Sequence, residues 1–295
     1  MKDEPLVSVV IATYNMGQYL PSAVESVLNQ DWQNLEVIVV DDGSLDNTPE
    51  SISRFKDDPR FRYVRTDNQG QPKAKNRGLA ESRGEFIGFC DADDLWHREK
   101  LKVQMPIFQN LKVGVSYTEV SYIDQFGTEI NKPQPYSRYS GNVTNQLAIK
   151  NFIPFGTALF RRACVEQNGS FDEDLPMGID WDLWLRYSLD WEFKYIPEKT
   201  YIYRLWPGQM SKNYRGRYDN ASRILTKFLK QYPNILPESV ISRAWADMHV
   251  SRAMAIANAE KTFREPFKDI LAGLRKDYAY WPAWRSLAKL VVRKF

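Results

Sequence analysis

The first part of the chain alternates short runs of apolar, β-branched residues with segments whose apolar residues recur every three or four positions. The runs predict strands buried on both faces, and the recurring pattern predicts amphipathic helices. The predicted strands are 6–12, 35–40, 61–64 and 85–90, and the predicted helices between and after them are 19–28, 48–55 and 73–82. This alternation predicts an α/β fold with a Rossmann-like, mostly parallel sheet and helices on both faces.

The pattern changes twice further along the chain. The segments that follow are a hairpin over 114–130 that turns at 125–127, a loop over 131–141, a strand over 156–160 and helices over 162–167 and 180–189. Beyond residue 214 the strand pattern disappears, and helices are predicted over 237–259, 262–276 and 281–292. We therefore expect a domain over 1–213 and a helical C-terminal extension over 214–295.

Composition excludes several classes of protein. The 295 residues are 43% hydrophobic and 26% charged, which is typical of a folded chain and not of a disordered one. Two cysteines cannot build a disulfide framework, and His97 and His249 are too far apart for a histidine metal site. The acidic, polar start is unlike a signal peptide, and no apolar run approaches the roughly 18 to 20 residues that span a bilayer. A cytoplasmic location is the resulting expectation.

Charge is distributed unevenly. Residues 211–295 contain 17 Lys and Arg against 7 Asp and Glu, a net charge of +10, while residues 1–210 carry −7. An acidic body and a basic extension suggest different binding roles for the two parts.

Acidic residues follow two of the predicted strands and open one predicted helix. After the strand 35–40, the carboxylates of Asp41, Asp42 and Asp46 are explained equally well by ligand binding and by a turn with a helix cap. After the strand 85–90, Asp91, Asp93 and Asp94 repel one another unless a cation joins them, so a Mg²⁺ or Mn²⁺ site is favoured over a cap by Asp94 on a helix starting near Arg98.

Asp180 opens the predicted helix 180–189, where a carboxylate complements the helix dipole; taken alone, that structural role is favoured. Other catalytic motifs are missing from the sequence. It contains no G-x-G-x-x-G fingerprint, no phosphate-binding G-x-x-x-x-G-K-[ST] loop and no nucleophile elbow around Ser44, so a dinucleotide oxidoreductase and a hydrolase triad are disfavoured.

Taken together, the motifs resemble the family 2 glycosyltransferases of the GT-A fold. The matching segments occur in the family's order and cover about residues 5 to 212: VSVVIATYN, VIVVDDGSLDNT, DNQGQPKAKNRGLAESRGEFIGFCDADDLW, MGIDWDLWLR and YRLWPGQMS. The resemblance implies a GT-A-type fold and transfer of a sugar from a nucleotide-diphosphate donor.

The resemblance also implies roles for individual residues. Those implied to bind the nucleotide are Ala12, Thr13 and Tyr14 at base and ribose, Asp42 at the base imide N–H, Gly70, Lys75 and Asn76 near base and diphosphate, Asp91 at the ribose, and Arg204 near the diphosphate. Asp93, with Asp91 through a bound water, is implied to hold Mn²⁺ or Mg²⁺, and Asp180 is implied to be the general base. Asp42 suits uracil or thymine, which favours UDP or dTDP.

Together these roles predict a single displacement with inversion at the anomeric carbon, because one base and one metal leave no second nucleophilic carboxylate. Three positions depart from the family pattern: Ile179 where a supporting Glu is common, Trp206 where His is common, and Lys75 where Arg is common. The Q-x-x-R-W signature of processive synthases is absent, so transfer of one or a few sugars is expected.

The last predicted helix has an apolar arc bordered by cations. On a helical projection Trp281, Trp284, Leu287, Ala288, Val291, Val292 and Phe295 fall on one side, with Arg285, Lys289 and Arg293 at its edge. Packing of this arc on the preceding helices is the favoured interpretation, and peripheral binding at a membrane's inner face is the alternative. Nucleic acid binding is not expected, because the aromatic and basic residues do not interleave.

The sequence thus predicts a metal-dependent inverting glycosyltransferase that acts on a glycan or lipid-linked acceptor. Two alternatives from other classes remain open. One is a sugar nucleotidyltransferase, and the other is a catalytically silent protein that binds nucleotide sugars as a scaffold.

Overall fold

The computed structural model describes residues 4–132, 137–209 and 213–292, and divides into two compact units. The first comprises Met1–Asn142, Phe152–Pro176 and Tyr187–Pro207; the second comprises Val143–Asn151, Met177–Arg186 and Gly208–Phe295. The domain division expected at residue 213 stays a prediction. Part of the predicted loop 131–141, at residues 133–136, lies outside the described residues.

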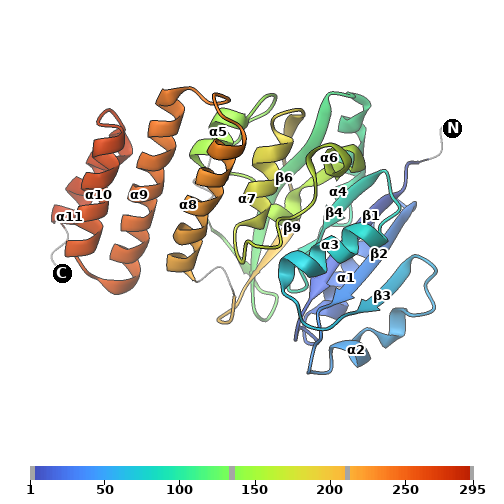
Figure 1. The fold of residues 1–295 in the computed structure, drawn as a ribbon. Coiled ribbons are helices and arrows are strands. Elements are labelled where there is room, and N and C mark those ends of the chain that lie inside the picture. Colours follow the sequence, from blue (N-terminus) through green and yellow to red (C-terminus); the bar gives the residue numbers. More distant parts are fainter. Residues whose placement is uncertain (1–3, 133–136, 210–212, 293–295) are drawn as a thin grey trace. The chain divides into compact units, whose positions relative to one another are not determined.

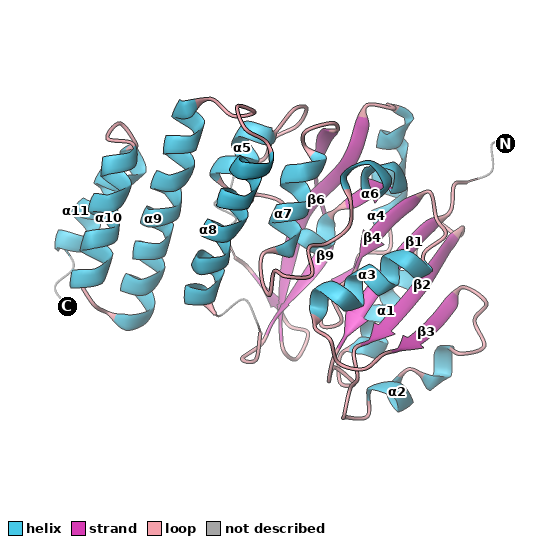
Figure 2. Ribbon diagram, in the orientation of Figure 1, coloured by secondary structure: helices cyan, strands magenta, loops and turns pink. Residues whose placement is uncertain are grey.

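The first unit contains a nine-stranded sheet (Figures 1 and 2). Its strands are β1 (Val7–Thr13), β2 (Leu35–Asp41), β3 (Phe61–Arg65), β4 (Phe86–Phe89), β5 (Leu95–Trp96), β6 (Val113–Asp124), β7 (Glu129–Ile130), β8 (Leu159–Arg161) and β9 (Glu192–Leu205). The order is β3-β2-β1-β4-β8-β6-β9-β5, with β7 paired to β6. Strands β1 to β4 and the long β6–β9 pair are parallel, while β5, β7 and β8 pair antiparallel to their neighbours. The predicted α/β fold with a mostly parallel sheet is confirmed.

Helices cover both faces of β1 because its side chains alternate between the two faces. Val7, Val9 and Ile11 pack in one core cluster with apolar residues of α1 (Leu20–Leu28). Val10 points to the other face, where α3 (Gln71–Glu81) crosses so closely that a Cβ on Gly78 would meet a Val10 methyl at 2.2 Å. The remaining helices of this unit are α2 (Thr48–Ser51), α4 (Lys100–Gln104) and α6 (Arg162–Asn168), with 3-10 turns at Ser53–Phe55, Met105–Gln109 and Phe155–Thr157.

The structure differs from the predictions at several places in this unit, among them the short strand β5, which was not predicted. Of the predicted strand 156–160, the first part is a 3-10 turn and the strand β8 begins at Leu159. The less favoured interpretation, a cap by Asp94 on a helix near Arg98, is wrong, because the chain continues into β5 and α4 starts only at Lys100. Strand β9 had no counterpart among the predicted elements.

Among the described residues of the second unit, the regular elements are all helices, joined by loops (Figure 2). It contains α5 (Thr144–Ile149), α7 (Ile179–Tyr187, whose last residue belongs to the first unit), α8 (Tyr214–Gln231), α9 (Glu238–Glu260), α10 (Arg264–Lys276) and α11 (Trp281–Val292). Apolar residues of α9, α10 and α11 form a separate core cluster that includes Val250, Ile270 and Leu290. The helical C-terminal extension is therefore confirmed, and α5 and α8 are helices that the periodicity did not identify.

Helix α11 packs with a different face from the predicted arc. Ala283 and Leu290 are fully buried and Leu287 packs beside them, whereas Trp281, Trp284 and Val292 are 67%, 46% and 80% exposed. Most of the predicted apolar arc is therefore turned away from the helical core; Phe295, at its end, lies outside the described residues. None of the helices in the described ranges is both long and apolar enough to cross a bilayer.

Candidate active site

Three neighbouring parallel strands bring polar side chains to one edge of the sheet. β2, β1 and β4 are adjacent, so their carboxyl ends, followed by Asp42, Tyr14 and Asp91, lie at the same edge. In open α/β sheets this edge is where ligands bind. Ala12 is half-buried and Tyr14 is exposed. The buried hydroxyl of Thr13 has no hydrogen-bond partner among the described residues, which leaves a polar group for a ligand or water to satisfy.

Asp42 organises the loop before α3. Its two carboxylate oxygens accept hydrogen bonds from the backbone N–H groups of Gln69 and Gly70, each at 2.8 Å. Gly70 has φ +94°, a conformation that L side chains rarely adopt, and it precedes the first turn of α3. A carboxylate oxygen has lone pairs for further donors, so Asp42 can still accept from a ligand while it holds this loop.

The neighbouring acids Asp41 and Asp46 have structural roles. Asp41 accepts hydrogen bonds from the backbone of Ser44 and from the hydroxyl of Tyr63, and Asp46 accepts from the Thr48 N–H at the start of α2. For these two residues the turn part of the turn-and-cap interpretation is confirmed, whereas the N-cap of α2 is Asn47, which makes no side-chain cap bond.

Lys75 is buried beneath the acidic segment and faces Asp91. Its Nζ lies 3.1 Å from Oδ1 of Asp91 and 3.8 Å from the ring centre of Phe155. The lysine side chain is 4% exposed and that of Asp91 is 32% exposed. A buried ammonium between an aromatic face and a carboxylate is held in place and remains a fixed positive charge beside the strand end.

Asp93 is hydrogen-bonded by two residues at and just after the end of β9. The indole Nε1 of Trp206 donates to Oδ2 of Asp93 at 2.6 Å, and Nε of Arg204 donates to the Asp93 carbonyl at 2.8 Å. Tyr19 lies 5.8 Å from the Trp206 ring, and its own ring is 4.8 Å from the Arg204 guanidinium. Trp206 is therefore a donor to the carboxylate and not a metal ligand, because an indole N–H has no free lone pair.

Asp94 lies behind the other two acids. It is 1% exposed, accepts from the Tyr201 hydroxyl at 2.7 Å, and accepts from the Arg204 backbone N–H at 2.7 Å. Burial, together with the negative charges of Asp93 and Asp91, raises the pKa of Asp94 well above its usual range. The segment is thus a region of strongly negative potential, which a cation would relieve.

Asn76 has a different environment from the one that the resemblance implies. Its amide donates to the Phe171 carbonyl and to Glu173, each at 2.9 Å, and accepts from the Phe171 N–H at 3.0 Å. These bonds fasten α3 to the 171–173 loop. Nucleotide binding by Asn76 stays a prediction, and it requires an exchange of these partners.

Asp180 lies in the first turn of α7, in the second unit. Its Oδ2 accepts a hydrogen bond from Nδ2 of Asn151, at 2.8 Å, and the side chain is half-buried. Ile179, at the position where the family resemblance implies a supporting Glu, is 4% exposed. The carboxylate is therefore oriented by an amide and not by a second carboxylate.

Several residues at this site were not found from the sequence. Tyr19, Tyr201 and Asn151 each contact a candidate residue, yet no motif marks them. The aromatic alternation of Tyr201 and Tyr203 in β9 is the one sequence signal that pointed to a strand there.

Across the residues that the structure describes, no group of three or more His, Cys, Asp and Glu side chains is arranged to hold a metal ion. Two carboxylates, Asp91 and Asp93, nevertheless suit Mg²⁺ or Mn²⁺ when the remaining ligands are phosphate oxygens and water. This donor set fits a cation shared with a diphosphate and does not fit a closed protein cage.

Comparison with known proteins identifies the family. The sequence model described as glycosyl transferase family 2 matches residues 8–169, more than half of the chain. The chain belongs to this family, and its strand-end carboxylates lie within the matched region.

Three curated relatives match this chain over part of their own length. An uncharacterized glycosyltransferase of Rickettsia bellii is 35% identical over 62% of this chain and 26% of its own length. Chondroitin synthase of Escherichia coli is 32% identical over 68% of this chain and 29% of its own length. TuaG of Bacillus subtilis, a glycosyltransferase provisionally assigned to teichuronic acid biosynthesis, is 34% identical over 51% of this chain and 59% of its own length. The match thus spans from about a quarter to less than two thirds of these relatives.

Solved structures share the fold. The mannosyltransferase PcManGT from Pyrobaculum calidifontis, determined with GDP-Man and Mn²⁺, superposes with a TM-score of 0.68 at 21% identity over 99% of this chain and 82% of that one. S. aureus TarS 1-349 with UDP-GlcNAc superposes with a TM-score of 0.61 at 17% identity over 96% and 90% of the two chains. The GT-A fold is therefore confirmed for this chain.

Proposed function

We propose that this protein is a metal-dependent, inverting glycosyltransferase that moves a sugar from a nucleotide-diphosphate donor to a hydroxyl of a glycan or lipid-linked acceptor. The observation that carries the proposal is the cluster at the carboxyl ends of β1, β2 and β4. There Asp91 and Asp93 lie with the fixed cations Lys75 and Arg204 in a chain of glycosyl transferase family 2.

Asp93 and Asp91 would hold the Mn²⁺ or Mg²⁺ together with the donor diphosphate. The cation supplies Lewis-acid stabilisation of the departing diphosphate, a role that requires no proton transfer. Burial is the first cause of the raised pKa of Asp94, and the negative charges of Asp93 and Asp91 are the second; a cation bound to these two carboxylates would relieve the second. Lys75 and Arg204 would add positive charge for the leaving group.

The nucleotide would bind over the ends of β1 and β2. Ala12, Thr13 and Tyr14 are proposed to line base and ribose, Gly70 to approach the base closely, and Asp42 to accept from the base imide N–H. This acceptor favours UDP- or dTDP-sugars over GDP-sugars, since uracil and thymine present an imide N–H beside two carbonyls.

Asp180 is proposed as the general base. Its carboxylate takes the proton of the acceptor hydroxyl as that oxygen bonds to the anomeric carbon and the diphosphate leaves with the bonding electron pair. Asn151 would orient the carboxylate through the bond at 2.8 Å. One displacement of this kind inverts the anomeric centre.

Two substitutions test the assignment of roles. Asp93→Ala should abolish Mn²⁺-dependent UDP binding in calorimetry and abolish donor turnover. Asp180→Asn should leave UDP and Mn²⁺ binding unchanged but lower turnover by about a thousandfold, the order of magnitude of a lost base. Asp57→Ala, which removes an exposed carboxylate, is the matched control. Near-normal turnover in Asp180→Asn would refute the mechanism.

Two observations favour the silent-scaffold alternative. Trp206 occupies Oδ2 of Asp93 and Ile179 replaces a supporting acid, so binding without turnover is its expected outcome. Release of nucleoside diphosphate from a UDP-, dTDP- or GDP-sugar decides between it and the transferase, and release of pyrophosphate would instead indicate a nucleotidyltransferase.

Peripheral membrane contact through α11 is a further part of the proposal. The exposed Trp281, Trp284, Val291 and Val292 form an apolar face flanked by the exposed cations Arg285 and Lys289. Aromatic residues at headgroup depth and cations on anionic lipid are the features of interfacial helices. An inner-face, cytoplasmic location follows as a prediction.

Flotation with vesicles of phosphatidylglycerol and phosphatidylcholine tests this contact. Trp281→Ser with Trp284→Ser should strongly reduce flotation. The control pair Leu111→Ser with Phe126→Ser also removes two exposed apolar side chains, 78% and 83% exposed, and should leave it unchanged. Equal flotation of both pairs would exclude α11 as the anchor.

A further inference from the structure

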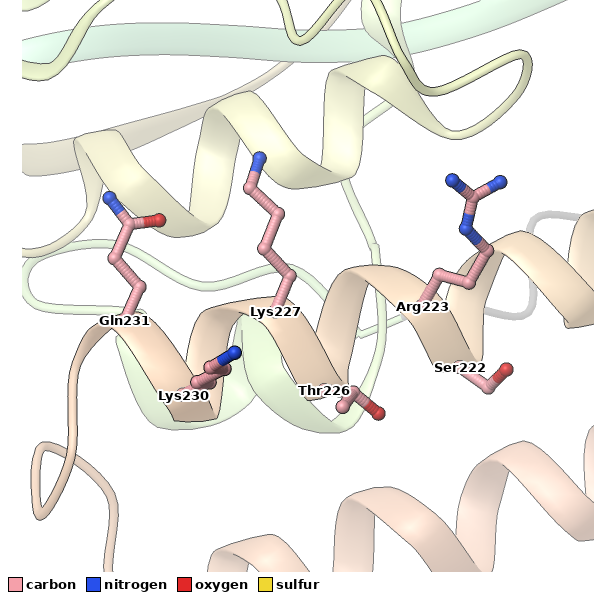
Figure 3. Close-up of a pocket in the computed structure, with 6 residues that line it drawn as sticks. All are labelled: Ser222, Arg223, Thr226, Lys227, Lys230 and Gln231. Carbon is pink, nitrogen blue, oxygen red and sulfur yellow. The ribbon is translucent and has the colours of Figure 1, made fainter.

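One face of α8 carries a groove whose lining is basic and hydroxylated. We call it the α8 groove; its lining residues are Ser222, Arg223, Thr226, Lys227, Lys230 and Gln231 (Figure 3). It is a shallow depression of about 670 Å³ that is open to solvent. All lining residues belong to the second unit.

Helical spacing builds this groove. Ile224, Leu225 and Phe228 are buried and hold α8 against the rest of its unit. The lining residues recur every four positions, so they form two parallel rows along the helix. The rows are Arg223, Lys227 and Gln231, which point together toward the neighbouring ribbon of α7 in Figure 3, and Ser222, Thr226 and Lys230. Together they cover about 14 Å of helix length, which suits an extended chain.

The lining of the α8 groove is basic. Three of its six lining side chains are cationic and none is acidic. Lys227 is fixed by an ion pair with Asp182, at 2.9 Å, but Arg186 also pairs with Asp182, at 2.8 Å. Two cations, one from α8 and one from α7, thus contact the same buried carboxylate.

The same ion pair connects the groove to the helix of the proposed base. Asp182 and Asp180 both lie in α7, and Lys227 binds Asp182 from α8. A ligand in the α8 groove is therefore held by a helix that is bonded directly to the helix carrying Asp180.

From these contacts we infer that the α8 groove binds an acidic glycan chain, one that carries carboxylate or phosphodiester groups, and that this chain is the acceptor. The inference rests on the proposed transferase function and names its acceptor class. Arg223 and Lys230 pair with the anionic groups, while Ser222, Thr226 and Gln231 offer hydrogen bonds to sugar hydroxyls.

Calorimetry with defined oligosaccharides tests the inference. The probes are an unsulfated chondroitin oligosaccharide, a ribitol-phosphate oligomer and a neutral dextran oligosaccharide of equal length. The full chain should bind at least one acidic probe, more weakly at higher ionic strength, and should not bind dextran. The acidic probe that binds identifies carboxylate or phosphodiester as the recognised group. Arg223→Gln with Lys230→Gln should weaken this binding about tenfold, as expected for loss of two exposed ion pairs.

A matched control comes from α10. Lys268 and Arg275 are both exposed and have the same seven-residue spacing as Arg223 and Lys230. Lys268→Gln with Arg275→Gln should leave acidic-probe binding within about twofold. Equal loss in both double variants would overturn the inference in favour of a diffuse field, and no loss in the groove variant would overturn it as well.

Donor assays separate this inference from the proposed function. UDP with Mn²⁺ should bind the groove variant as tightly as the unchanged protein. If the protein never turns over a donor, yet its acidic-probe binding depends on Arg223 and Lys230, the transferase proposal fails and the binding site remains. If donor turnover is normal and neither acidic probe binds, the groove inference fails alone.

Discussion

Glu36 shows at the scale of one residue how a buried carboxylate stabilises the first unit. It is 2% exposed and accepts hydrogen bonds from the Ser8 hydroxyl, the Arg83 backbone N–H and the Arg83 guanidinium, at 2.6 to 3.0 Å. Burial acts to raise the pKa of Glu36, but the bonds from Ser8 and Arg83 outweigh it, so the pKa is lower than its usual value. The carboxylate thus joins β1, β2 and the segment before β4.

The lowered pKa predicts the direction of a pH effect. A group with a depressed folded-state pKa stabilises the protein above its unfolded pKa, and this contribution is lost as pH falls from about 5 through the folded value. Glu36→Gln should lower the free energy of unfolding by about 2 kcal/mol at pH 7 and by clearly less at pH 4. Urea unfolding at both pH values measures this.

The control for this prediction is an exposed ion pair. Glu25 pairs with Arg54 while both side chains are more than half exposed, so Glu25→Gln should change stability by less than about 0.5 kcal/mol. The same loss for Glu36→Gln at pH 4 and pH 7 would contradict the role of its charge.

Single residues also show the limit of sequence-based prediction. The acids after β2 and β4 could be located, because the carboxyl ends of parallel strands define a ligand-binding edge. Their partners could not be predicted. Asp42 accepts hydrogen bonds from the backbone N–H groups of residues 69–70, and Asp93 accepts one from Trp206. Both sets of partners depend on which loops, distant in the sequence, the fold brings together.

At the scale of elements, the turn at Phe155–Thr157 packs against β9 with no spare space. A Cβ on Gly156 would lie 2.1 to 2.3 Å from ring atoms of Tyr201, whose hydroxyl donates to Asp94. The glycine is needed here for close approach of backbone to an aromatic ring. This contact positions the acidic segment through β9.

Gly156→Ala should therefore displace Tyr201 and lower the free energy of unfolding by about 3 kcal/mol, as overpacking in a dense core does. It should also weaken binding of UDP with Mn²⁺, because Asp94 loses its hydroxyl partner. Denaturant unfolding and calorimetry measure the two effects.

Tyr201→Phe is the matched variant, since it removes only the hydroxyl. It should cost about 1 to 2 kcal/mol, less than Gly156→Ala, because the ring stays in place. If Gly156→Ala left the free energy of unfolding unchanged, Tyr201 and β9 would be able to move to make room for the methyl group. That outcome would contradict the prediction.

The elements themselves were predictable to an uneven degree. β1, β2, β4 and α1 follow from continuous β-branched runs and from three-to-four-residue periodicity. β9 was not predicted, because its sequence EFKYIPEKTYIYRL mixes charged residues with aromatic ones. Its pairing with β6 joins segments that are far apart in the sequence. α8 was not predicted, although its buried apolar residues Ile224, Leu225 and Phe228 recur at helical spacing.

At the scale of the whole molecule, two separate cores predict two responses to damage. Ile270 and Val39 are both fully buried, the first in the core of α9, α10 and α11 and the second in the core of the sheet. Each unit has its own apolar cluster, so a cavity in one should destabilise that unit first.

Hydrogen exchange measures this localisation. Ile270→Ala should lower the opening free energy of amides in α9 and α10 by about 3 kcal/mol and leave those of β1 and β2 nearly unchanged, and Val39→Ala should do the reverse. Equal loss of protection throughout the described chain, in either variant, would show one cooperative unit instead.

The second unit is assembled from Val143–Asn151, Met177–Arg186 and Gly208–Phe295. Asp180, Asn151 and the α8 groove all lie within these segments, whereas the strand-end carboxylates do not. Recombination between relatives that exchanged all three segments together would therefore transfer the residues proposed to handle the acceptor as a set and leave the proposed donor site of the recipient intact. A single crossover near residue 208 would instead combine α7 from one parent with α8 from the other. The ion pairs of Asp182 would then form only if the first parent carried Asp182 and Arg186 and the second carried Lys227.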